Sequence, residues 1–174
     1  IPGFYIDVPY EKNQDSISYV ADQLRELKKF LEDVGGKKIS EQSVQRAVAN
    51  SNEAASYYSS QLALRKDHDP VTSLTNELYA IFMCHLLAGS EESLIYTKML
   101  IEDVKKAPKG EGLHILWMHM MPFLQEPVKD VFNYSQNVHI RACDFVADGF
   151  QRMQASDPYE ALAEKWSTAF TTEV

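Results

Sequence analysis

Residues 113–118 read Leu113-His114-Ile115-Leu116-Trp117-Met118, a short and nearly continuous apolar run. Turn-forming residues bound it, with Gly112 before it and Pro122 after it. An apolar run of this length between turn residues is typical of a strand that is buried on both faces of a parallel sheet. We therefore expect a strand here that needs a neighbour in the same sheet.

A second apolar segment, Val138 to Cys143, is predicted to supply that neighbour. The stretch from Pro127 to about Ser135 is long enough for a short helix between the two strands. A strand, a helix and a strand in this order form a right-handed crossover, which makes the two strands parallel. Antiparallel pairing of the two segments would contradict this prediction.

A further helix is predicted after the second strand. Asp157 is a capping acid, Pro158 suits the first helical position, and Glu160 stands three residues after the cap. This pattern predicts a helix from Pro158 to about Phe170. Residues 112–174 are thus expected to form a partial three-layer α/β lobe with parallel strands.

The residues before position 108 have a different pattern, in which apolar side chains recur at helical spacing. Four helices are predicted, at 17–34, 40–66, 73–88 and 91–106. The break at Pro108-Lys109-Gly110-Glu111-Gly112 then predicts a lobe boundary. We expect a helical lobe over residues 10–107 and a helix-rich α/β fold for the whole chain.

The two ends suggest a piece of a longer protein. Phe4 to Val8 is similar to the tail of a strand leaving a sheet. Residues 1–9 are therefore expected to be the end of a strand from an N-terminal lobe that the chain lacks. The other end, Thr168 to Val174, stops directly after a helical pattern, so we expect an excised segment.

The composition narrows the classes of function. The 174 residues are 45% hydrophobic and 24% charged, which provides enough apolar material for a core. Their 17 basic and 25 acidic side chains give a net charge of −8, which disfavours nucleic acid as a partner. No apolar stretch approaches the roughly 20 residues that span a bilayer, and no secretory signal is visible. The two cysteines form no CxxC pair, which fits a reducing cytoplasm.

The candidate binding residues follow the two predicted strands, because ligands of open parallel sheets bind beyond the carboxyl ends of the strands. Without a GxGxxG motif or a phosphate-binding loop, glycine amides are not expected to cradle a phosphate. We expect an apolar edge with polar tips; the alternative is that these are ordinary loop and core residues. The candidates are His119, Met120, Met121, Pro122 and Phe123 after the first strand, and Asp144, Phe145, Asp148 and Gly149 after the second.

Five histidines and two cysteines raise the question of a metal site. His114, His119 and Cys143 lie on the predicted strands or at their ends, but no three ligands stand at a recognisable metal-binding spacing. Cys84 and His85 are adjacent on a helix and point in different directions. We expect no complete metal site in this chain, and no catalytic triad is visible in the sequence.

Several motifs, in order along nearly the whole chain, resemble those of one enzyme family. They are Tyr5-Ile6-Asp7-Val8-Pro9, Tyr19 to Gly36, Lys38 to Asn52, His114 to His119, Val138 to Asp144, and Asp157-Pro158-Tyr159-Glu160-Ala161-Leu162-Ala163. Their combination is similar to the central part of a subunit of the 2-hydroxyacyl-CoA dehydratase and benzoyl-CoA reductase family, of the 2-hydroxyglutaryl-CoA dehydratase D-component type.

The resemblance implies a parent subunit of about twice this length, with an α/β lobe on each side of a helical middle. It also implies a cytoplasmic enzyme of amino-acid fermentation that eliminates water from a 2-hydroxyacyl-CoA through a ketyl radical. In that enzyme a 4Fe-4S cluster held by cysteines takes an electron from an ATP-dependent activator protein and passes it to the acyl-CoA thioester. A second dehydratase subunit is the other partner implied.

The resemblance assigns no catalytic residue in this chain. The family's cluster cysteines belong largely to flanking parts, and neither Cys84 nor Cys143 matches one. We therefore expect this chain by itself to carry no cluster and to dehydrate nothing. Two alternatives stay open: a benzoyl-CoA-reductase-like subunit that reduces an aromatic thioester, and a non-catalytic helical interaction or assembly module.

Overall fold

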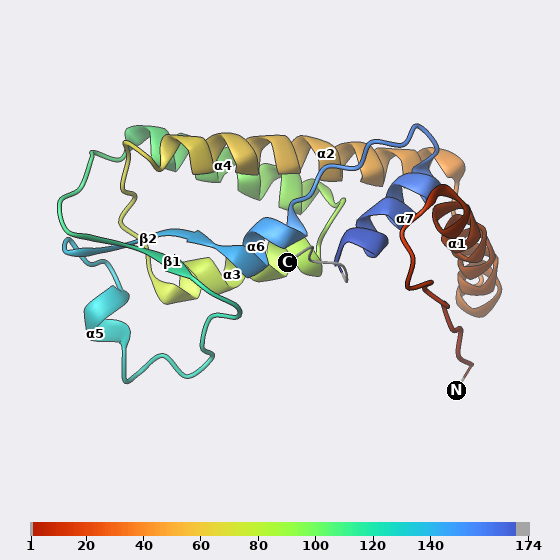
Figure 1. The fold of residues 1–174 in the computed structure, drawn as a ribbon, viewed down its shortest axis with the longest axis horizontal. Helices are drawn as coiled ribbons and strands as arrows, with labels where there is room; N and C mark the ends of the chain where they lie inside the picture. The colour runs from red at the N-terminus through yellow and green to blue at the C-terminus, as the bar shows by residue number, and fades with distance from the viewer. Residues whose placement is uncertain (1, 170–174) are drawn as a thin grey trace. The chain divides into compact units, whose positions relative to one another are not determined.

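A computed structural model of the chain describes residues 2–169, with side chains described as far as residue 166. In chain order its elements are α1 (Gln14–Gly35), α2 (Glu41–Leu64), α3 (Leu74–His85), α4 (Glu91–Lys106), β1 (Leu113–Trp117), α5 (Lys129–Phe132), β2 (Val138–Cys143), α6 (Asp144–Gly149) and α7 (Pro158–Ala169) (Figure 1). The structure is 56% helical and its two strands form a small parallel sheet. The predicted helix-rich α/β class is confirmed.

The described chain forms two compact units, each with its own core. Unit 1 comprises residues 2–49 and 152–169, and unit 2 comprises residues 50–151. This division crosses α2. The lobe boundary at residues 108–112 stays a prediction.

Unit 1 is built on α1 and α7, which pack against one another. Both helices begin at side-chain caps: Asn13 Oδ1 accepts the backbone N–H of Ser16 (2.9 Å), and Asp157 Oδ1 accepts that of Glu160 (3.0 Å). At the end of α1, Gly36 has φ 64°, the left-handed conformation that glycine tolerates best. The core of unit 1 consists of Val20, Ala21, Tyr159 and Ala163.

Residues 2–13 are described as irregular chain, without a strand. The tail of a strand expected at residues 4–8 therefore has no sheet to join among the described residues. Hydrogen bonds of Asp7 attach this segment to α1 instead, one of them from the Tyr19 hydroxyl to the Asp7 carboxylate at 3.2 Å. The Asp7 N–H donates to Gln23 Oε1 and Gln23 Nε2 donates to the Asp7 carbonyl, both at 2.8 Å.

Unit 2 contains the sheet, in which β1 and β2 are parallel, as predicted. Leu113 pairs with Val138 and Trp117 with Cys143, with one irregularity in the register after Ile115. The helix expected between the strands is present as α5, although it is shorter than the predicted 127–135. The strand-helix-strand unit deduced from the apolar runs is therefore confirmed.

The burial of β1 differs from the prediction. The sequence indicated a strand buried on both faces, but Leu113 is 62% and Leu116 59% exposed. The reason is that the core of unit 2 gathers on β2: its buried cluster includes Ile140 and Cys143, whereas Ile115 and Trp117 of β1 are only partly buried against it. An apolar run predicts what a strand can bury, whereas the elements packed against the strand decide what it does bury.

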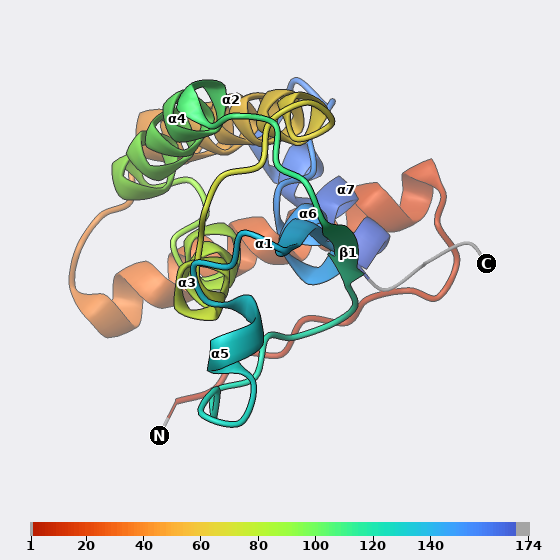
Figure 2. The same ribbon diagram turned by 90° about the vertical axis from the view of Figure 1, so that its left-hand side faces the viewer.

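The core of unit 2 lies against β2, where α2, α3 and α6 contribute side chains. Tyr58 of α2 stacks on Phe150 with ring centroids 4.6 Å apart, and Leu74 at the start of α3 is fully buried. Helix α4 lies alongside the second part of α2 (Figures 1 and 2), where Lys98 Nζ pairs with Glu53 at 2.9 Å. The second strand, rather than the first, is thus the centre of this unit.

A buried arginine crosses this core. Arg65, directly after α2, donates from Nη1 to the Ile140 carbonyl of β2 at 2.9 Å and from Nε to Gln61 Oε1 at 2.8 Å. Its Nη2 lies 3.5 Å from Glu77 Oε1 of α3, and both charged side chains are buried. Since a buried charge is costly unless it is paired, these contacts fix α2 and α3 against β2.

One helix was not predicted, and the ends of two others differ from the sequence prediction. Helix α6 follows β2 directly and was not predicted, because six residues are too few to show helical periodicity. Helix α2 ends at Leu64 rather than at residue 66, and α3 ends at His85 rather than at residue 88. The predicted end of the last helix, at about Phe170, lies outside the described residues.

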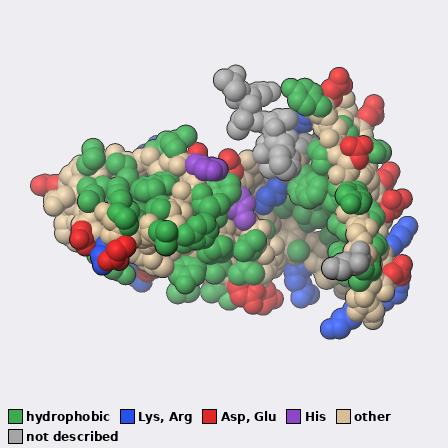
Figure 3. Space-filling model, turned by 90° about the horizontal axis from the view of Figure 1, so that it is seen from below, with side chains coloured by type: hydrophobic (Ala, Val, Ile, Leu, Met, Phe, Trp, Pro, Cys, Tyr) green, Lys and Arg blue, Asp and Glu red, His purple; other side chains and the backbone are tan. Residues whose placement is uncertain are grey.

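Large hydrophobic side chains are exposed on unit 2, and Figure 3 shows such side chains gathered over this unit. Those between residues 113 and 124 are Leu113, Leu116, Met118, Met120, Phe123 and Leu124. Among the described residues, every helix is too short or too polar to cross a bilayer.

Gly149→Ala is expected to destabilise unit 2. A Cβ atom at this position would lie 2.5 Å from Sγ and 2.6 Å from Cβ of Cys84. Overpacking of this kind costs about 1–3 kcal/mol, so the urea midpoint of unfolding should fall. Gly35→Ala is the matched control, because nothing lies within 4 Å of the added Cβ and alanine favours the helix. An unchanged midpoint for Gly149→Ala would contradict the described packing.

Candidate functional site

The chain turns sharply where β1 ends. His119 has φ 68°, a left-handed conformation that is uncommon for a residue other than glycine. Its backbone N–H donates to Asp144 Oδ1 at 2.6 Å, and the same oxygen accepts the N–H of Phe145 at 2.6 Å. Asp144 thereby connects the carboxyl ends of both strands, and its hydrogen bond offsets part of the backbone strain at His119.

Two histidines flank Phe145 of α6. The ring centroid of His85 lies 4.5 Å from that of Phe145, and the ring centroid of His119 lies 5.6 Å from it. Nε2 of His85 also donates to the Phe145 carbonyl at 2.8 Å. His85 was not a sequence-predicted candidate, because only the packing of α3 against α6 brings it to this end of the sheet.

The other sequence-predicted residues differ in burial. Met121 is buried in the core of unit 2, whereas Met120 and Phe123 are exposed. Nε1 of Trp117 donates to the Met120 carbonyl at 3.4 Å. The structure therefore brings His119 and Asp144 together, places Met121 in the core, and leaves Met120 and Phe123 as apolar surface on the same turn.

Neither cysteine is placed as a nucleophile. The thiols of Cys84 and Cys143 are buried, and each donates to a backbone carbonyl at 3.3 Å. Burial raises the pKa of the Cys143 thiol, so it stays protonated at neutral pH. Both residues act as core side chains in this chain.

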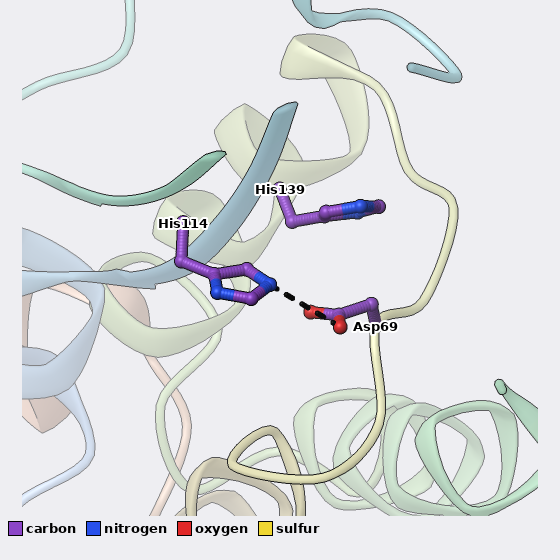
Figure 4. Close-up of side chains that lie close together, drawn as sticks. All are labelled: Asp69, His114 and His139. Atoms are coloured by element: carbon purple, nitrogen blue, oxygen red, sulfur yellow. Dashed lines mark ion pairs between the residues drawn. The ribbon is translucent and has the colours of Figure 1, made fainter. Parts of the chain in front are cut away.

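A second cluster of polar side chains lies near the amino ends of the two strands (Figure 4). His114 and His139 are paired positions of β1 and β2, with ring centroids 5.5 Å apart. Asp69, between α2 and α3, completes a group in which one ligand atom of each residue lies within 4.8 Å of the others. No sequence spacing could reveal this group, because the sheet register and a distant loop create it.

Asp69 is 2% exposed, and groups from several segments contact its carboxylate. Its Oδ2 accepts the N–H of Gly110 at 2.8 Å and lies 3.4 Å from Nε2 of His114. Nη2 of Arg141 lies 3.2 Å from Asp69 Oδ2 and 2.8 Å from His114 Nε2. Nε2 of His139 lies 3.2 Å from the Glu111 carbonyl. The cluster therefore joins the sheet to the segments before α3 and before β1.

The family model for the 2-hydroxyglutaryl-CoA dehydratase D-component matches residues 1–173. The chain belongs to this family. It is accordingly a subunit of the 2-hydroxyacyl-CoA dehydratase type, as the ordered motifs suggest. A comparison with curated proteins finds no match.

A 4Fe-4S cluster, which the family resemblance implies, does not fit the residues of this dehydratase chain. Such a cluster is held by four cysteine thiolates, whereas this chain has two cysteines and both are buried thiols. Among the described residues, the group that could hold a metal ion consists of Asp69, His114 and His139, and contains no sulfur. A cluster would need ligands from outside this chain.

Asp144→Ala is expected to loosen the carboxyl edge of the sheet. The substitution removes the acceptor of two hydrogen bonds, which should cost about 1–3 kcal/mol and increase hydrogen exchange at the His119 amide. Urea unfolding and amide exchange measure the two effects. Asp148→Ala, at an exposed position of the same helix, is the control and should change neither. Equal unfolding midpoints and equal amide exchange rates in the two variants would contradict the role given to Asp144.

Proposed function

We propose that this dehydratase subunit takes part in a one-electron elimination of water from a 2-hydroxyacyl-CoA. The observation that carries the proposal is the family match, which extends over residues 1–173. A low-potential donor such as a 4Fe-4S cluster supplies the electron in chemistry of this kind. Because this chain has too few cysteines for that cluster, its proposed contribution is to the binding of the thioester.

The chemistry explains why an electron is required. The hydroxyl group leaves from the carbon beside the thioester carbonyl, where the carbonyl disfavours developing positive charge. One electron added to the carbonyl gives a ketyl radical anion, which expels hydroxide. The adjacent carbon then loses a proton and the electron is returned, so that the balance is the loss of one water without net oxidation.

We assign the thioester contact to the edge formed by residues 119–123 and Asp144. Ligands of parallel sheets bind at the carboxyl ends of the strands, where this edge lies. The exposed side chains of Met120 and Phe123 offer an apolar surface, and the His119 ring lies beside Phe145. An apolar surrounding limits access of water, which protects a reactive radical from side reactions.

The proposal includes two protein partners, a second dehydratase subunit and an ATP-dependent activator. Membership of a family named for one component of a dehydratase supports action with other subunits. The exposed large apolar side chains of unit 2 also support it, because apolar patches on a surface mark interaction sites. The exposed run includes Leu116, Met118 and Leu124.

The activity test combines this dehydratase subunit with a second subunit, the activator, ATP and a reductant. We expect conversion of a 2-hydroxyacyl-CoA to the enoyl-CoA, and a reduction of kcat/KM of about tenfold or more for Phe123→Ala, as for a lost contact of about 1.4 kcal/mol. Lys109→Ala, an exposed substitution away from this edge, is the control. Reduction of benzoyl-CoA would instead favour the reductase-like alternative, and an assembled but inactive complex would favour the assembly module.

The isolated chain is expected to carry no iron-sulfur cluster. Its two cysteines are fewer than the four thiolates that a 4Fe-4S centre uses. Anaerobic reconstitution with iron and sulfide, followed by iron analysis, visible absorption and EPR, measures this directly. A stoichiometric cluster that is lost in Cys84→Ser or Cys143→Ser would contradict the prediction and identify that cysteine as a ligand.

A further inference from the structure

We propose that Asp69, His114 and His139 bind a first-row divalent cation of the zinc class, and that Arg141 competes with the cation for Asp69 and His114. The inference does not depend on the proposed thioester chemistry. It concerns the amino ends of β1 and β2, whereas the proposed thioester contact lies at their carboxyl ends.

The donor set is suitable for a borderline-soft cation. Two imidazoles and one carboxylate are ligands that zinc and neighbouring divalent metals accept together. Bonds of about 2.0–2.2 Å in a tetrahedral site place ligand atoms about 3.3–3.6 Å apart. Nε2 of His114 and Oδ2 of Asp69 already lie 3.4 Å apart, and all three ligand atoms lie within 4.8 Å of one another.

The ligands are supported by the fold rather than by flexible segments. His114 and His139 are neighbours because they are paired residues in a parallel register, so the sheet sets the separation of their rings. Nε2 of His139 lies 3.2 Å from the Glu111 carbonyl. Such a carbonyl accepts a hydrogen bond from one ring N–H, and this kind of contact orients the imidazole in metal sites.

One oxygen of the Asp69 carboxylate could accept a further bond. The side chain is buried, and its Oδ1 has no hydrogen-bond donor among the described residues. Arg141 Nη2 lies 3.1 Å from this oxygen, but its hydrogen bond goes to Oδ2. A buried carboxylate oxygen without a donor is costly, and a bound cation would satisfy it.

The guanidinium of Arg141 occupies the position that the cation would take. Its Nη2 contacts Asp69 and lies 2.8 Å from Nε2 of His114, so it uses the lone pair that a metal would need. The guanidinium supplies the positive charge that a buried carboxylate requires. Its side chain is 20% exposed, which leaves a route by which it can turn toward solvent when a cation binds. Binding of a metal and this contact of Arg141 are therefore mutually exclusive.

Competition predicts the effect of removing the arginine. Arg141→Gln should tighten binding of Zn²⁺ by about tenfold or more, since the metal no longer displaces a paired guanidinium. The test uses the chain freed of metals with a chelator. Calorimetric titration with Zn²⁺ measures stoichiometry and affinity, and visible absorption of bound Co²⁺ reports the ligand geometry.

The expected result is one Zn²⁺ per chain in the wild type, with tighter binding in Arg141→Gln. His114→Ala should lose binding and is expected to fold, because its ring lies at the surface of an edge strand. Asp69→Asn should lose binding as well. If Asp69→Asn does not fold, His114→Ala decides the test by itself. The control is His68→Ala, which removes the histidine beside Asp69 that contacts the Ala107 carbonyl instead, and which should retain binding.

Thermal unfolding provides a second measurement. The proposed cation joins the loop before α3 to both strands, so it binds the folded chain and not the unfolded one. Excess Zn²⁺ should therefore raise the thermal unfolding midpoint of the wild type but not that of His114→Ala. The proposal is overturned if the wild type binds no Zn²⁺ while folded, including the case in which Arg141→Gln alone binds. It is equally overturned if His114→Ala retains the affinity of the wild type.

Discussion

The buried pair of Arg65 and Glu77 is the constraint on which unit 2 depends. A two-stranded sheet is only marginally stable by itself, so β1 and β2 need helices packed against them. Arg65 provides this connection by contacting Gln61 beside it, Glu77 of α3 and the Ile140 carbonyl of β2. Because a buried guanidinium without partners would be far more costly than a paired one, the helices and the strand must keep these positions together.

The parallel pairing of β1 and β2 produces both candidate sites of the chain. At the amino ends, equal positions of the two strands bring His114 beside His139. At the carboxyl ends, the same pairing lets Asp144, which follows β2, accept the backbone N–H of His119, which follows β1. The pairing of these two strands therefore explains a nitrogen-rich cluster at one end and an apolar edge with polar tips at the other.

The family match and the residues of this chain give different information about its function. The family identifies the class of subunit, and the two buried cysteines show that this chain lacks a complete set of cluster ligands. The carboxyl edge combines exposed apolar surface with an aspartate that joins both strands. The proposed role in holding the thioester is consistent with that combination.

The amino-acid sequence by itself determined the class of fold, the parallel strands, the carboxyl end of α1, the beginning of α7, and the family. These features depend on local signals: apolar period, Gly36 in a left-handed cap, and Asp157 as a capping acid. It also placed His119 and Asp144 after the two strands. The tertiary structure alone decided that β1 is exposed, that α6 forms, that His85 joins His119 around Phe145, and that Asp69 lies beside His114 and His139. The physical reason is that the surroundings of β1, His85 and Asp69 come from segments far apart in the chain, so burial and register create these contacts and no local pattern records them. Helix α6 was missed because its six residues are too few to show a helical period.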